Sequence, residues 1–178
     1  MPREQEFSAD NVMNNQMAQL DADFAQTIRE LHASLSTAEA SPVWTGFLAS
    51  SWKVRRNPID QIDRVEDHEP WASIKREASL EFFKTGKSTR PDNPVIDPRF
   101  PVNTDYKFRE KNIFIGNAAE YAGYASENPV ISQFVQGEAG QIIKDNMREK
   151  GKIFVGAKPS SGFGKIKRGF ALRYIEPS

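Results

Sequence analysis

Few residues of this chain have the types and spacing that catalysis or metal binding requires. The only histidines are His32 and His68, and neither belongs to a His-Glu-x-x-His pattern, so a histidine-based metal site is not expected. His32 is expected at the polar edge of a helix. His68 lies in the acidic run 66–69. A loop metallohydrolase built around it is the least favoured alternative, because a solvated charge cluster explains this run more simply.

Other catalytic patterns are missing from the sequence. The segment 162–167 looks superficially like a phosphate loop, but it lacks the Gly-x-x-x-x-Gly-Lys-Ser/Thr spacing, and we interpret residues 159–168 as a basic, Gly-rich turn. The sequence has no cysteine, no nucleophile elbow and no convincing pair of carboxylates in an apolar setting. We therefore predict a protein that is not an enzyme, with no catalytic residue, no cofactor and no metal.

Composition favours one polar but folded unit. The chain has 178 residues, which predicts a single domain over 1–178, and its 12 Phe and 3 Trp argue against general disorder. No apolar run is long enough for a membrane helix and residues 1–6 do not resemble a signal peptide, so a soluble intracellular protein is expected.

Charge is distributed unevenly although the net charge is zero. Residues 1–40 contain two basic and seven acidic residues, whereas residues 150–178 contain seven basic residues and one acidic residue. Unlike charges at the two ends suit contacts between copies of a chain in a ring.

Hydrophobic spacing predicts an α+β fold. Apolar residues from Met13 to Leu35 recur every three or four positions, which predicts an N-terminal helix over 8–36. A shorter helix is expected between Pro70 and Gly86, and an amphipathic one from Pro129 to Gly151. Strands are expected from Trp52 to before Pro58, over 106–116 with an interruption, over 152–155 and over 169–175. The expected fold is thus a small, mostly antiparallel sheet of four or five strands packed with the long N-terminal helix and a second amphipathic helix.

Residues 87–105 carry four prolines and little periodicity, which predicts an extended, Pro-rich arm. Connections of this length usually have a partner or a function. We expect this arm to reach a neighbouring subunit or an adjoining ring.

Two segments resemble a known family. Thr45-Gly-Phe-Leu-Ala-Ser-Ser-Trp-Lys-Val54 resembles the Thr-Gly-x-Leu-x-x-Ser-hydrophobic-x-Val motif of the tail-completion, or neck (tail terminator), proteins of tailed double-stranded DNA bacteriophages. Residues 113–127 are similar to that family's later strand and turn, which lead into Asn-x-x-x-Tyr-Ala-x-x-x-Glu. The order of helix, motif, strand, second motif, helix and closing strand also matches.

The resemblance implies a structural subunit of a head-to-tail joining ring, often hexameric, that links the portal or connector ring to the tail tube. It implies a location in the virion neck or tail after assembly in the host cytoplasm, with DNA passing through the lumen and no membrane partner. Leu48 and Val54 would face the core, with the turn at Thr45 and Gly46 releasing the helix into the sheet. Within this hypothesis the expected subunit contacts are Arg99, Phe100, Tyr106, Tyr121 and Tyr124. Lumen or adjacent-ring contacts are expected from Lys165, Lys167 and Arg168.

One alternative from another class stays open. The basic C-terminal segment would suit a protein that binds nucleic acid without sequence preference, because lysine and arginine neutralise phosphates without reading bases. The sequence leaves open the ring size, the position of the ring in the neck, the type of tail and the host.

Overall fold

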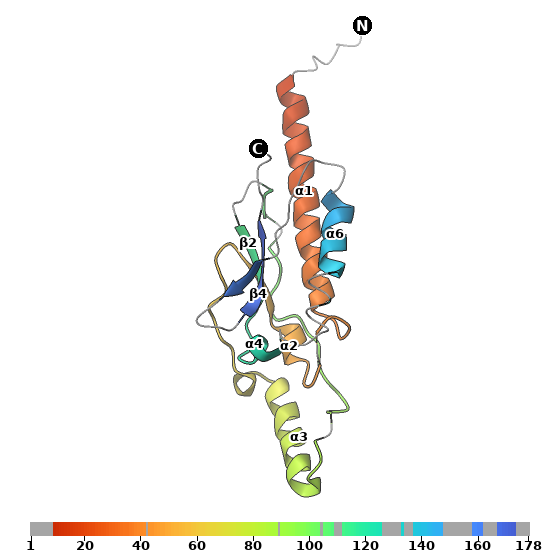
Figure 1. Ribbon diagram of the computed structural model, residues 1–178, viewed down its shortest axis with the longest axis vertical. Coiled ribbons are helices and arrows are strands. Elements are labelled where there is room, and N and C mark those ends of the chain that lie inside the picture. The colour runs from red at the N-terminus through yellow and green to blue at the C-terminus, as the bar shows by residue number, and fades with distance from the viewer. Residues whose placement is uncertain are drawn as a thin grey trace.

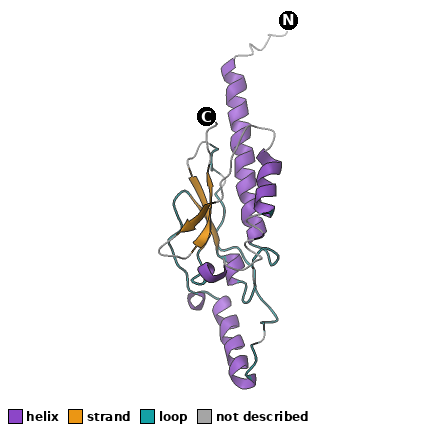
Figure 2. Cartoon of the chain, in the orientation of Figure 1, coloured by secondary structure: helices purple, strands orange, loops and turns teal. Residues whose placement is uncertain are grey.

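The computed structural model describes residues 9–41, 43–88, 90–103, 105–108, 112–125, 133, 137–147, 158–161 and 167–173. The molecule is elongated, with a long helix extending from one end and a shorter helix from the other (Figure 1). Between them lie the strands and two short helices (Figure 2). The elements in chain order are α1 (Ala9–Leu35), α2 (Phe47–Ser50), β1 (Trp52–Arg55), the 3-10 helix η1 (Val65–Asp67), α3 (Trp71–Thr85), β2 (Asn112–Asn117), α4 (Ala122–Ala125), α6 (Glu138–Met147), β3 (Lys158–Ser161) and β4 (Lys167–Arg173).

The predicted N-terminal helix is confirmed as α1. Its second half packs into the body through Ile28, Leu31 and Leu35, which are fully buried, whereas Val12 and Met13 near its start are exposed. The helix ends where the Ser36 amide donates to the carbonyl oxygens of residues 32 and 33. The first half of α1 therefore projects beyond the strands and α6, as Figure 1 shows.

The expectation for His32 was wrong. Its side chain is 6% exposed, and its ring Nε2 lies 3.0 Å from the Trp52 carbonyl oxygen, which accepts a hydrogen bond from it. Burial lowers the pKa of His32, and the hydrogen bond to the Trp52 carbonyl opposes this effect only in part. The imidazole thus connects α1 to β1 in its neutral form.

The predicted sheet of four or five strands packed with helices is corrected: packing is described only for one pair of antiparallel strands, and for the other two strands only backbone pairing is described. This pair is β1 and β2, with Trp52 opposite Asn117 and Arg55 opposite Phe114, and helices form most of the other regular structure around it. β4 pairs antiparallel with β2, and β3 with β4, but their side chains lie outside the described part of the structure and add no described packing.

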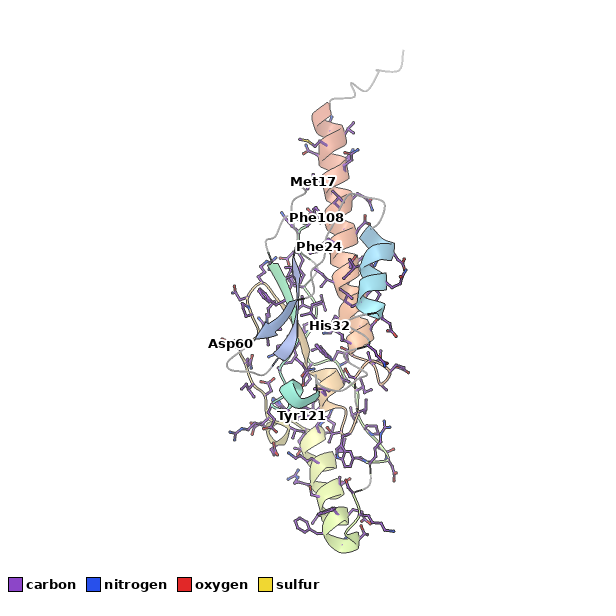
Figure 3. All side chains as sticks on the ribbon, viewed as in Figure 1. Met17, Phe24, His32, Asp60, Phe108 and Tyr121 are labelled. Atoms are coloured by element: carbon purple, nitrogen blue, oxygen red, sulfur yellow. The ribbon has the colours of Figure 1, made fainter. Side chains whose placement is uncertain are left out.

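The expected strand positions changed for physical reasons. The predicted first part of the 106–116 strand is irregular, because Tyr106 and Phe108 hold this segment to the body through other contacts. The Tyr106 hydroxyl donates to the Val54 carbonyl oxygen at 2.9 Å, and the Phe108 amide donates to Asp21 Oδ1 at 2.8 Å. The Phe24 and Phe108 rings also meet edge to face, with centroids 6.0 Å apart (Figure 3). The strand predicted over 152–155 lies outside the described residues.

Two clusters of buried side chains form the interior. The first joins α1 to the strand pair and α6, and the second joins α2 to η1, α3 and α4. The first contains Ile28, Leu31, Leu35, Ala40, Trp52, Val54, Tyr106, Ile113, Ile115 and Ala139. The second contains Phe47, Leu48, Val65, Trp71, Ala119 and Ala122. The expectation that Leu48 and Val54 face the core is thus confirmed.

The amphipathic C-terminal helix is present as α6, which lies against α1 (Figure 1). Its described length begins at Glu138 after a turn at Gly137, and Ile142 and Ile143 pack onto the first cluster. Its predicted start at Pro129 lies outside the described residues.

The shorter helix is confirmed as α3, which ends at Gly86 in the left-handed conformation with φ of 68°. Only its first turn is well buried, through Trp71 and Ala72. Phe82 is 48% exposed, and Phe83 is 83% exposed. The far end of α3 therefore presents aromatic side chains away from the body.

The Pro-rich segment is irregular wherever the structure describes it, as expected, but its part from Val95 to Arg99 is held by its own chain. Between Val95 and Arg99, backbone amides donate to the Thr45 and Ser50 carbonyl oxygens at 3.0 and 2.9 Å. The Asp97 amide donates to the Ser50 hydroxyl at 2.9 Å. This part of the segment covers α2, and the expected contact with a neighbouring subunit stays a prediction.

Candidate functional site: a buried cation cluster between two motifs

The two segments that carry the family resemblance pack into one unit. They are about 60 residues apart in the chain, yet β1 of the first segment pairs with β2 of the second. Asn117 strengthens this connection, because its side-chain amide donates to the Leu48 carbonyl oxygen at 2.7 Å. Within its own segment, its Oδ1 accepts from the Ala119 amide at 2.9 Å, which holds the side chain in place. The Ala118 amide also donates to the Ser51 carbonyl oxygen at 2.9 Å.

Gly46 allows the segment around Val95 to cover this unit. Its φ is +93°, a conformation that side-chain-bearing residues rarely adopt. A Cβ atom at this position would lie 1.8 Å from the Val95 carbonyl oxygen. That oxygen also accepts a hydrogen bond from Trp71 Nε1 at 2.8 Å. Gly46 thus begins α2, whereas we expected the turn to release the long helix into the sheet.

Three charged side chains lie close together at this unit. Lys53 and Asp63 are 2% and 7% exposed, and Arg99 is 13% exposed. Asp63 Oδ2 lies 3.2 Å from Arg99 Nη2 and 3.7 Å from Lys53 Nζ. This oxygen accepts no hydrogen bond from the described residues, so the two cations compensate it electrostatically.

Neutral groups complete the cluster. Gln61 accepts from Lys53 Nζ at 2.8 Å and donates to Asp63 Oδ1 at 3.0 Å. Lys53 Nζ also lies 3.8 Å from the centre of the Phe100 ring, a cation–π contact. Burial lowers the pKa of Lys53, and the negative charge of Asp63 works against that effect.

Arg99 connects the segment that covers α2, residues 95–99, to several elements. We call these residues the covering segment. Its Nη1 donates to the Ser51 hydroxyl at 3.2 Å, and its Nη2 lies 2.9 Å from His68 Nε2. Because arginine only donates, the His68 nitrogen must accept. Arg99 also lies over the rings of Phe47 and Trp71 at 4.8 and 5.7 Å.

The expected solvated cluster at 66–69 is correct for its acids and wrong for its histidine. Glu66 and Glu69 are exposed and pair with Lys75 and Arg76 of α3. His68 is half-buried and stacks on Phe47 with ring centroids 5.7 Å apart. No group of acids and histidines that could hold a metal occurs within the described ranges.

The cluster of Lys53, Asp63 and Arg99 is suited to holding segments of the chain together. Two cations beside one carboxylate disfavour a further cation, and the carboxylate is already neutralised. Sequence reasoning missed Lys53 and Asp63, because a lysine in an exposed-looking alternating run and an aspartate in a polar loop give no sign that they will meet. The lysine lies inside the Thr-Gly motif, which is the one signal that could have drawn attention to it.

The residues predicted for subunit contacts are involved mostly in contacts within the chain. Arg99 and Phe100 belong to the cation cluster, and Tyr106 is 4% exposed. Tyr121 packs on the second buried cluster near α4 (Figure 3), and burial raises its pKa to about 12. Tyr124 lies in α4, but its side chain is outside the described part. Their role in subunit contacts stays a prediction.

The predicted lumen contacts are less fully described. Lys165 lies outside the described residues. Lys167 and Arg168 lie in β4, and only their backbone is described. Residues 159–161, the first part of the predicted basic turn, belong to β3.

No protein-family model, no curated protein and no solved structure matches this chain. None of the helices in the described ranges combines the length and the apolar character needed to cross a bilayer.

Proposed function

We propose that this protein is a structural subunit of a phage head-to-tail joining ring, which links the portal or connector ring to the tail tube. The observation that carries the proposal is the packing of residues 45–54 against residues 113–122. These are the segments that resemble the tail-completion family, and a resemblance that reflects a shared fold requires them to form one unit. Strand pairing, the hydrogen bond from the Asn117 side chain to the Leu48 carbonyl oxygen and the hydrogen bond from the Ala118 amide to the Ser51 carbonyl oxygen join them.

The internal architecture also supports a structural role. The charged side chains inside the body are used to hold the covering segment, α2 and the strand pair together. Such a cluster rigidifies a subunit and does not present a reactive group to solvent.

The shape of the chain supports assembly. Helices project from both ends of the long axis, and exposed large apolar side chains lie on them (Figure 1). Exposed apolar residues that gather on projecting elements mark surfaces for contact with other proteins.

The proposal is tested by asking whether the protein forms rings and where it resides. Purified full-length protein is examined by size-exclusion chromatography with light scattering and by negative-stain electron microscopy over a concentration series. In parallel, virions made by a phage that carries the gene with a small epitope tag are labelled with gold. Rings in solution, or gold at the junction of head and tail, are expected.

Two outcomes contradict the proposal. The first is a protein that stays monomeric and is absent from virions. The second is DNA binding that weakens steeply with salt and disappears in the variant Lys165→Glu, Lys167→Glu, Arg168→Glu while no ring forms, which would favour the nucleic-acid-binding alternative.

A further inference from the structure

We propose that the far end of α3 on one copy of the chain docks against the projecting first half of α1 on the next copy. This head-to-tail contact names the subunit interface of the ring proposed above, and its closure into a ring rests on that proposal. The contact itself is argued from exposure, charge and position.

The far end of α3 combines apolar and basic side chains. Leu80, Phe82 and Phe83 are 58%, 48% and 83% exposed, and the Phe82 and Phe83 rings meet edge to face with centroids 6.2 Å apart. Residues 80–90 contain three basic residues and one acidic residue. The last two turns of α3 and the residues after them thus form an end that is exposed, apolar and positively charged, which we call the α3 tip.

The first half of α1 has the complementary character. Val12 and Met13 are 39% and 57% exposed. Residues 9–23 contain three aspartates and no lysine or arginine, and two of the three, Asp21 and Asp23, are half-buried. Asp21 also accepts a hydrogen bond from the Phe108 amide, so the charge of this part of α1 is negative but only partly exposed at its surface. This part of α1, here called the α1 arm, is therefore apolar on one face and negatively charged, the opposite sign to the α3 tip.

Position decides between a contact within one chain and a contact between copies. The α1 arm and the α3 tip lie at opposite ends of the long axis, with the strands and α2 between them (Figure 1). They cannot meet in one molecule of this shape. A complementary pair of surfaces at opposite ends produces a heterologous contact, which repeats from copy to copy and closes into a ring when the rotation between copies allows it.

Physical chemistry favours a helix-on-helix contact of this kind. Aromatic side chains on one helix can pack between side chains of another, and unlike charges at the rim steer the two surfaces together. An amphipathic tip with basic residues could also bind an anionic membrane, but the acidic, apolar arm at the other end has no place in that explanation. A second copy accounts for both surfaces at once.

Disulfide trapping tests the contact directly, because the chain has no cysteine of its own. Gln16 is exposed and lies three and four positions after Met13 and Val12, on the same face of α1. Ser79 is exposed and lies four positions before Phe83, on the same face of α3. Full-length Gln16→Cys, carrying an affinity tag, is mixed with untagged Ser79→Cys under mild oxidation. A mixed disulfide dimer is expected.

A matched control uses the same residue type on the same helix. Gln26 is exposed and lies about 15 Å further along the α1 axis, so Gln26→Cys mixed with Ser79→Cys should give only background cross-linking. The double variant Gln16→Cys, Ser79→Cys should form a ladder of multimers. Adding Phe83→Ser to the Ser79→Cys chain should lower the yield of mixed dimer about tenfold, because that ring supplies much of the apolar contact. Circular dichroism checks that each variant is folded, and Lys84→Cys is a second reporter on the tip if Ser79→Cys is not.

The outcomes separate this inference from the proposed function. If the mixed dimer forms no better than the control, the contact is wrong even where rings and virion labelling are seen. Binding of the α3 tip to phosphatidylserine vesicles without cross-linking would also overturn it. If the mixed dimer and ladder form but neither rings nor virion labelling are found, the contact stands and the head-to-tail joining function is wrong.

Discussion

Replacing Gly46 by alanine tests the central packing of the body. The new Cβ would be forced into a φ of +93°, at about 1 to 2 kcal/mol, and would lie 1.8 Å from the Val95 carbonyl oxygen. Since that oxygen belongs to the backbone, the covering segment must move. The movement strains or breaks the hydrogen bonds that join Val95 to Thr45 and to Trp71, each of which contributes about 0.5 to 1.5 kcal/mol. The expected loss in free energy of unfolding is about 2 to 5 kcal/mol.

Gly86 provides a matched control for this experiment. It also has a positive φ, +68°, but a Cβ there meets nothing within 4 Å. Gly86→Ala should therefore lose only the conformational part, about 1 to 2 kcal/mol. Both variants are measured by urea unfolding followed by tryptophan fluorescence. Equal losses for the two glycines would refute the close approach of the covering segment to α2.

Three further predictions concern buried polar side chains. Asp63→Ala should lower the free energy of unfolding by about 3 to 5 kcal/mol, because it leaves Lys53 and Arg99 buried without their counter-charge. Asn117→Ala should cost about 1 to 3 kcal/mol by removing two buried hydrogen bonds, one to Leu48 of the first motif and one to Ala119 within the second. For His32, the pKa is lowered in the folded state and close to 6.5 in the unfolded one. Stability should be full above about pH 6.5 and fall as the pH drops, by at most about 1.4 kcal/mol per pH unit, until the folded pKa is passed.

Each of these measurements has its own control. Asp105→Ala removes an exposed ion pair with Arg56 and should change stability by less than about 1 kcal/mol, so a similar loss for Asp63→Ala would argue against the buried cluster. Asn117→Asp places a buried carboxylate against the Leu48 carbonyl oxygen and should destabilise at least as much as Asn117→Ala. His32→Gln should flatten the change in stability between pH 7.5 and 5.5, and an unchanged slope would contradict the assignment to His32.

Periodicity and helix-end residues predicted the two longest helices well. The stripe from Met13 to Leu35 located α1, and Pro70 with Gly86 located α3, because helix ends and apolar faces are written locally in the chain. Periodicity did not show which part of each stripe would find a partner. The apolar side chains at the start of α1 and at the end of α3 follow the same pattern as the buried ones, yet they remain exposed.

Local sequence patterns could not predict the contacts between residues that are far apart in the chain. Alternation of apolar residues cannot say whether Tyr106 joins a strand or donates to the Val54 carbonyl oxygen 52 positions away. The cation cluster likewise joins Lys53, Asp63 and Arg99 from three separate segments. Arg99 and Phe100 were singled out as residues with a role, but as partners for another subunit and not as parts of this interior.

The hydrogen bond between Trp71 Nε1 and the Val95 carbonyl oxygen has a consequence for engineering the chain. It brings the point where the polypeptide enters α3 beside the point where it returns to the body. The residues between these two points can be removed. A short glycine-rich bridge in place of residues 74–92 would delete α3 after its first turn and leave every residue of both buried clusters in the chain. Such a shortened chain would separate what holds one molecule together from what that molecule offers to others.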